Sequence, residues 1–133
     1  MICIRREATM SKICYESTST GNDFSVSKSS MAAKGDNTAL CGYGADGKRT
    51  NGYDHVIIPQ PEKEADGAAG TGTSRFCGLA LALASKSAMR LDLDPATVCT
   101  KSLPFNVRFL SDNGEAEMDN GGTGFRLSYT QSK

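Results

Sequence analysis

Apolar and polar residues alternate with a period of two in most segments where any pattern can be recognised. Aromatic and branched residues occupy every second position from 105 to 109, and the segment 125–130 repeats this arrangement. Such alternation gives one apolar and one polar face, which is typical of half-buried antiparallel strands. A further strand is predicted at 56–58, ending at Pro59. Weaker patterns predict strands at 2–7, 12–16 and 24–27.

The segment 79–93 has two interpretations. Leu79, Leu81 and Leu83 alternate with alanines, which favours a strand. Its content of Ala, Leu, Lys and Met favours a short helix. The strict alternation makes the strand the preferred prediction, with the helix as the alternative.

Long stretches rich in turn residues separate these segments. Five glycines fall within 35–52, and the acidic stretch 112–124 is also rich in glycine. The segment 59–74 is polar and has no periodicity, which predicts an exposed loop. Short strands joined by such loops predict an all-β fold, a sandwich or a barrel. A chain of 133 residues suits a single domain.

Composition removes several function classes. The 15 basic and 15 acidic residues balance, so neither a nucleic-acid partner nor a membrane-surface patch is expected. The longest mostly apolar run, 77–84, is far shorter than a bilayer span, so no membrane insertion is expected. Apolar residues make up 38% of the chain, a modest supply for a core that covalent cross-links would strengthen.

The cysteines suit disulfides better than a metal. They stand far apart at positions 3, 14, 41, 77 and 99, never in the close pairs that zinc sites use, and His55 is the sole histidine. Wide spacing is typical of disulfides formed in an oxidising compartment. Five reduced cysteines in a cytosolic β-protein remain the alternative.

Three segments together resemble the CUB domain family, and in particular the divergent CUB-like domains of secreted arthropod proteins. They are Cys41 followed by Tyr53-Asp54-His55-Val56-Ile57-Ile58, then Arg75-Phe76-Cys77-Gly78, and finally 103–112 followed by Gly124-Phe125-Arg126-Leu127-Ser128-Tyr129. The resemblance runs from Cys3 to Gln131. It implies one antiparallel β-sandwich of the jelly-roll type over 1–133, an extracellular setting, and recognition of a protein or glycan rather than catalysis.

The chain departs from the family pattern in two places. Cys41 and Asp54 have 12 residues between them, where the family has only a few. The family's first cysteine and opening strand have no counterpart, and no signal peptide precedes Ile2. We therefore expect the domain to lack its first strand here, with further sequence upstream.

The resemblance also implies a disulfide framework. Cys41 would pair with Cys77, and Cys3 would stay single because its family partner lies upstream. Cys14 and Cys99 are then left as the second pair. Sequence alone permits 15 ways to pair four of the five cysteines.

Calcium is the sharpest site hypothesis that the resemblance offers. Many CUB domains hold one Ca²⁺ through carboxylates from separate loops, and this hard cation requires several oxygen ligands. The matching positions are Asp54 and Asp112, with Asn113 as a further oxygen donor and Asp36 in the place of the family's upstream acidic residue. A structural role is the alternative, because Asp112 can cap the turn before Asn113-Gly114 and Asp54 can accept hydrogen bonds at a strand start.

Nothing in the chain favours catalysis. His55 lies in a predicted strand, and no serine or cysteine stands in a nucleophile-elbow sequence. The stretch Gly67–Gly72 lacks the Lys-Ser/Thr of a phosphate loop and is interpreted as a flexible loop. No small-molecule cofactor is expected. The expected function is an extracellular, non-enzymatic recognition or adhesion module that Ca²⁺ assists. The alternative is a non-catalytic appendage of a secreted protease or other hydrolase.

Overall fold

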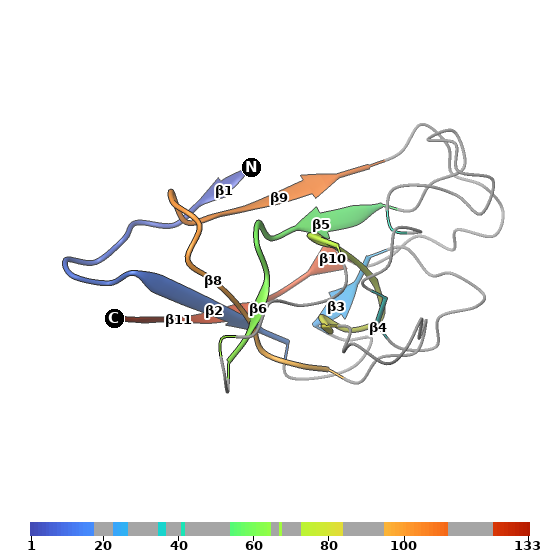
Figure 1. The fold of residues 1–133 in the computed structure, drawn as a ribbon. Helices are drawn as coiled ribbons and strands as arrows, with labels where there is room; N and C mark the ends of the chain where they lie inside the picture. Colours follow the sequence, from blue (N-terminus) through green and yellow to red (C-terminus); the bar gives the residue numbers. More distant parts are fainter. Residues whose placement is uncertain are drawn as a thin grey trace, which may run out of the picture.

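The computed structural model describes residues 1–17, 23–26, 35–36, 41, 54–64, 67, 73–83, 95–111 and 124–133. All regular secondary structure within these ranges is β. Over the same ranges, no helix has the length and apolar character needed to cross a membrane. The strands are β1 (Ile2–Cys3), β2 (Lys12–Glu16), β3 (Phe24–Ser25), β4 (Gly35–Asp36), β5 (His55–Ile57), β6 (Glu62–Lys63), β7 (Arg75–Gly78), β8 (Val98–Thr100), β9 (Asn106–Leu110), β10 (Gly124–Phe125) and β11 (Ser128–Ser132) (Figure 1).

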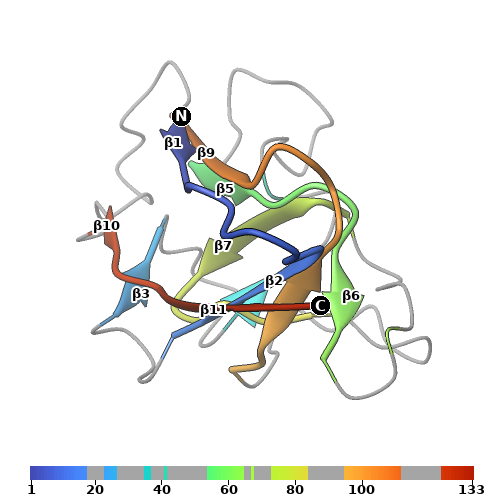
Figure 2. The ribbon, with the colours of Figure 1, turned by 90° about the vertical axis from the view of Figure 1, so that its left-hand side faces the viewer.

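Two antiparallel sheets form the layers of a sandwich (Figure 2). The first has the strand order β1-β9-β5-β7-β4, and the second has the order β11-β2-β8-β6. A short pair, β10-β3, stands beside them and is linked to β7 by a bridge between Val26 and Gly78. The non-consecutive order of strands within both sheets fits a jelly-roll type of sandwich. The all-β prediction is therefore confirmed.

The core lies between the two layers and draws side chains from both. Ile13 and Tyr15 of β2 face Val56 of β5 and Phe76 of β7 in one buried cluster. Alternation explains the selection, because Ile13 and Tyr15 point inward while Cys14 between them points to the opposite face. The other members of the cluster are Phe24, Val26, Ile58, Leu81, Leu83, Val98, Phe105 and Val107.

Most predicted strands form, with shorter bounds. The segment 12–16 is confirmed as β2, and the strand predicted at 56–58 is present as His55–Ile57. Of the predicted segment 2–7, only Ile2–Cys3 is a strand, and Ile4 continues the pairing by donating its N–H to the Phe105 carbonyl (2.9 Å). The predicted strand 125–130 is divided into β10 and β11 by residues 126–127.

Two predictions need correction. The expected exposed loop at 59–74 contains β6, whose half-buried Glu62 and Lys63 pair with β8. Two residues are too few to show a period, so the sequence could not reveal this strand.

The second correction concerns 79–83, where the preferred strand is absent and no helix takes its place. Ala80 to Leu83 are all buried. The backbone of Leu81 is not paired with a neighbouring strand: its N–H donates to Ser17 Oγ (3.3 Å), and its carbonyl accepts from the Ala96 N–H (2.9 Å). Alternating Leu and Ala cannot indicate a half-buried strand, because both residues are apolar. Residues 84–93 lie outside the described ranges.

Candidate functional site

Two of the four predicted calcium ligands lie in the described part of the chain. Asp54 is half-buried and directly precedes β5, and Asp36 is the last residue of β4. Asp112 and Asn113 lie outside the described residues, although β9 and Ser111 lead directly to them. The calcium set as a whole therefore stays a prediction.

Strand register brings part of this set to one end of the five-stranded sheet. His55 pairs with Leu110, so β5 begins where β9 ends, and Asp54 lies beside the point where the chain leaves for residue 112 (Figure 1). In the same sheet β7 follows β5 and β4 follows β7, and Asp36 of β4 pairs with Cys77 of β7. Two strand spacings place the Asp36 backbone about 10 Å from that of His55. Loops could bring oxygen ligands together at this end, but among the described residues no three His, Cys, Asp or Glu side chains gather as a metal site requires.

The two expected disulfides are present. Cys41 bonds to Cys77 and Cys14 bonds to Cys99, while Cys3 is free and exposed. The Cys41–Cys77 bridge fastens residue 41 to β7 at Cys77, the register partner of Asp36. The Cys14–Cys99 bridge joins directly opposed residues of β2 and β8.

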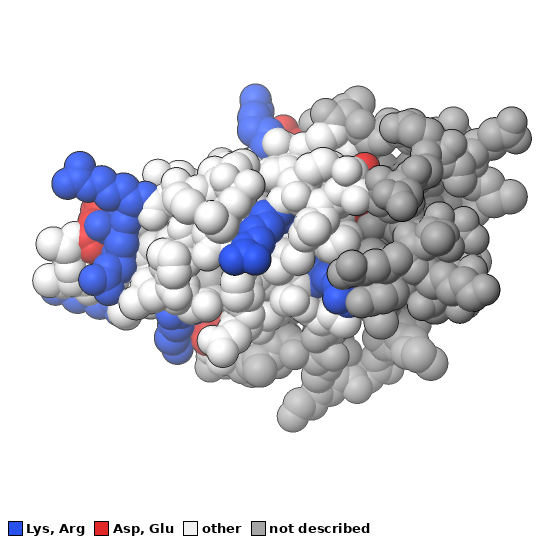
Figure 3. Space-filling view, turned by 90° about the horizontal axis from the view of Figure 1, so that it is seen from above, with Lys and Arg blue, Asp and Glu red and all other residues white. Residues whose placement is uncertain are grey.

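A row of side chains on the outer face of the five-stranded sheet was missed by the sequence analysis. Arg108, Ile57 and Arg75 are register partners across β9, β5 and β7. They point away from the core because Val56, next to Ile57, points into it. Figure 3 views the molecule from above, the side on which β1 and β9 lie in Figure 1; single Lys and Arg side chains rise there from mostly uncharged surface, and several more gather at its left end. The period of two predicted an outward Arg108, but the row depends on strand pairing that no local pattern shows.

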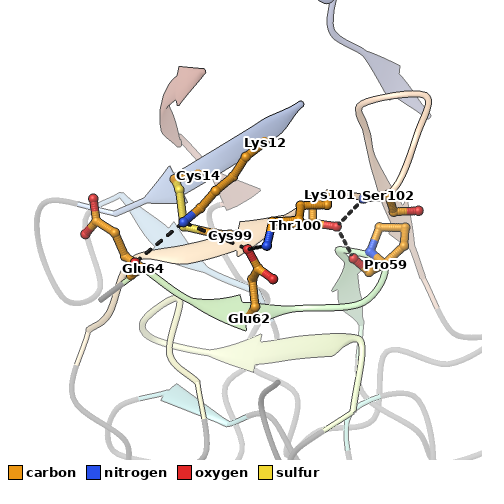
Figure 4. Close-up of polar contacts among 9 residues, drawn as sticks. All are labelled: Lys12, Cys14, Pro59, Glu62, Glu64, Cys99, Thr100, Lys101 and Ser102. Atoms are coloured by element: carbon orange, nitrogen blue, oxygen red, sulfur yellow. Dashed lines mark hydrogen bonds and ion pairs between the residues drawn. A yellow bond between two sulfur atoms is a disulfide. The ribbon is translucent and has the colours of Figure 1, made fainter. Parts of the chain in front are cut away.

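A cluster of charges on the outer face of the four-stranded sheet links its edge strand β6 to Lys12 of β2 and to Lys101, which follows β8 (Figure 4). Glu62 Oε1 lies 3.4 Å from Lys101 Nζ and 3.9 Å from Lys12 Nζ, and Lys12 Nζ also donates to the Glu64 carbonyl (3.5 Å). Glu62 is opposite Cys99, so these groups surround the Cys14–Cys99 bridge. Because two lysines already neutralise this carboxylate, the cluster holds strands together and offers no charge for a metal ion.

These features define a small disulfide-linked β-sandwich, a class typical of extracellular domains. The family model for the animal CUB domain matches residues 1–132. The chain belongs to the CUB domain family. Domains of this family are generally extracellular, non-catalytic modules that interact with proteins. Neither the curated proteins nor the solved structures include a match to this chain.

Proposed function

We propose that this chain is a secreted, non-enzymatic recognition module that binds a protein or glycan, with Ca²⁺ organising the loops at one end of the sandwich. The observation that carries the calcium part is the register pairing of His55 with Leu110. It places Asp54 and the chain leading to Asp112 and Asn113 at the same end of one sheet. Carboxylates on separate but adjacent segments are a suitable set for a cation that takes six to eight oxygen ligands.

The disulfides support the secreted setting. Cross-links persist in oxidising compartments and are reduced in the cytosol. The Cys41–Cys77 bridge also fixes residue 41 next to β4, which carries Asp36. A ligand on this strand would therefore be attached to a rigid part of the sheet, and rigid ligands lose less entropy when they bind an ion.

Calcium titration followed by thermal unfolding tests the ion. Ligand that binds only the folded state raises its stability, by about 2.7 kcal/mol at a hundredfold excess over Kd. We expect Ca²⁺ to raise the Tm of the wild type, and Asp54→Asn or Asp112→Asn to reduce this rise. Glu64→Gln is the matched control, because Glu64 is exposed and directly follows β6 of the other sheet. A rise in Tm that both Asp variants keep in full would place the ion elsewhere.

Recognition itself is tested with arrays of extracellular proteins and of glycans, probed in Ca²⁺ and again in EDTA. Specific binding that EDTA and Asp54→Asn both weaken supports the whole proposal. Binding that neither EDTA nor Asp54→Asn affects would support the recognition role but show that Ca²⁺ has no part in it. Failure to bind any member of either array, by a folded protein, would count against the recognition role.

A further inference from the structure

The outer face of the five-stranded sheet carries two arginines with an isoleucine between them, here called the arginine row. Arg108 of β9 pairs with Ile57 of β5, and Ile57 pairs with Arg75 of β7 (Figure 2). Directly opposed residues of antiparallel strands place their side chains on the same face of a sheet. β9, β5 and β7 each have a paired strand on both sides, so the row lies within the sheet and depends on no open edge.

The arginine row combines accessible positive charge with an apolar centre. Arg108 is exposed and has no ion-pair partner in the described part of the chain, while Ile57 and Arg75 are half-buried. Leu110 follows Arg108 by two residues and therefore lies on the same face, where it is 41% exposed. Arginine is enriched in protein interfaces, and their buried centres are apolar. The composition of this surface is therefore that of a protein-binding site.

The backbone holds the two arginines at a set spacing. Neighbouring strands lie about 4.8 Å apart, so the backbones of Arg108 and Arg75 are about 10 Å apart. Thr73 Oγ1 accepts a hydrogen bond from the Arg75 N–H (3.1 Å), which fixes the start of β7. The pairing of β9 with β5 fixes Arg108 in the same way. A partner therefore meets two cations on a rigid sheet, and little backbone order is lost on binding.

The apolar centre decides between two kinds of anionic partner. The guanidinium fork forms paired hydrogen bonds with a carboxylate, and it also attracts the sulfate groups of a glycan. A sulfated glycan would place polar groups against Ile57 and Leu110, where they would lose water without gaining hydrogen bonds. A protein can instead place an apolar side chain over Ile57 and a carboxylate on each side of it. Charge and apolar surface together therefore favour an acidic protein segment.

We propose that the arginine row is a docking surface for an acidic protein segment. Two carboxylates of the partner reach Arg108 and Arg75, and an apolar side chain between them covers Ile57. This contact adds a second surface to the recognition role proposed above and needs no Ca²⁺, because no predicted calcium ligand belongs to the row. An exposed Arg–carboxylate pair contributes little by itself. A short peptide should therefore bind weakly, and a partner that buries a full interface should bind more tightly.

NMR titration of the isotope-labelled protein in EDTA tests this contact without any contribution from Ca²⁺. The probe is the capped peptide Glu-Ser-Leu-Ser-Glu, whose first, third and fifth side chains share one face when it is extended. At low ionic strength we expect saturable shifts, with a Kd in the millimolar range, at the amides of β9, β5 and β7. The peptide Gln-Ser-Leu-Ser-Gln should not bind, and added salt should weaken the binding of the Glu peptide.

Charge reversal shows whether the arginine row itself makes the contact. Arg108→Glu should raise the Kd of the Glu peptide at least about fivefold and should bind Lys-Ser-Leu-Ser-Lys better than the wild type does. Arg6→Glu is the matched control, because Arg6 is an exposed arginine between β1 and β2, and it should leave the Kd unchanged. Ile57→Ser should weaken binding by removing the apolar centre. The spectrum of each variant also shows whether it keeps the fold.

Four results would overturn the proposal. The first three are an absence of saturable shifts at β9, β5 and β7, equal weakening by Arg108→Glu and Arg6→Glu, and binding that Ile57→Ser leaves unchanged. The fourth is tighter binding of a sulfated heparin disaccharide than of the Glu peptide at the same amides, which would assign the row to a glycan. Because the titration is made in EDTA, each of these results leaves the calcium-organised recognition site to its own test.

Discussion

Tyr15 is a residue whose chemistry follows from its place in the fold. Its side chain is 1% exposed in the core, and its hydroxyl has no hydrogen-bond partner among the described residues. Burial, with a smaller contribution from Tyr129 directly opposite on β11, raises the pKa of Tyr15 from 10.0 to about 12. The folded state therefore keeps the phenolic proton at a pH where the unfolded chain has released it.

This difference predicts a loss of stability in alkali. Stability contributed by the raised pKa is complete below about pH 10 and is lost as pH rises toward 12, with about 1 kcal/mol gone by pH 11. Urea unfolding from pH 8 to pH 11 measures the loss. Tyr15→Phe should abolish the part due to this group, and its stability at neutral pH should be unchanged or higher because the hydroxyl it removes is unpaired. Equal slopes for Tyr15→Phe and the exposed control Tyr129→Phe would contradict the assignment.

Local alternation predicted which residues of β9 point inward, but not how far they are covered. Val107 is buried as expected, whereas Phe109 on the same face is 47% exposed. Phe109 contacts the ring of Phe125 on β10 (6.2 Å between centroids), beyond the cover of the four-stranded sheet (Figure 1). Asn106, predicted to be on the polar face, is buried beside β1 and donates its side-chain N–H to the Pro104 carbonyl (2.7 Å). Coverage depends on where neighbouring strands end, and one strand's sequence does not contain this information.

At the scale of elements, one buried threonine of β8 holds the segment that leads from β5 to β6. Thr100 Oγ1 donates to the Pro59 carbonyl (2.5 Å) and accepts from the Ser102 N–H (3.0 Å), and the residue is 1% exposed (Figure 4). The bond to Pro59 joins segments 41 residues apart, at the point where the chain passes from β5 in one sheet to β6 in the other.

Removing this hydroxyl should destabilise the domain. Thr100→Val keeps the shape of the side chain but leaves two backbone groups without their partner, which costs about 1–3 kcal/mol. Thr100→Ser keeps the hydroxyl and serves as the control, so it should lose less. Urea unfolding measures both variants. A Thr100→Val protein as stable as the wild type would show that water replaces the threonine at both groups.

The elements predicted best were those with a strong period and a clear end. β9 had the period and β5 had the end, at Pro59, whereas β2 formed as predicted although its pattern was weaker. β6 was missed because its partner β8 is distant in the sequence: Glu62 pairs with Cys99, 37 positions further on. The candidate site was predictable only in part, since the resemblance supplied Asp54 and the Cys41–Cys77 bridge. The row of Arg108, Ile57 and Arg75 required the register of three strands.

At the scale of the whole molecule, we expect the two disulfides to supply a large part of the free energy of folding. Their loops span 85 and 36 residues, and the chain-entropy model assigns stabilisations of about 4–5 and about 4 kcal/mol to such lengths. A domain of this size has a total stability of only about 5–15 kcal/mol. The two bridges together therefore contribute a large share of the free energy of unfolding, which agrees with the modest apolar content of the chain.

Removing the bridges one at a time and then together tests this balance. Cys14→Ser with Cys99→Ser, or Cys41→Ser with Cys77→Ser, should leave a folded domain whose free energy of unfolding is lower by about 3–5 kcal/mol. The fully reduced protein should lose its cooperative urea transition at 37 °C, because the core alone cannot offset the chain entropy of the unfolded state. Cys3→Ser is the control and should change nothing, since this thiol is exposed and unpaired. A reduced protein that unfolds at the same urea concentration as the oxidised one would show that packing between the two sheets is sufficient without either bridge.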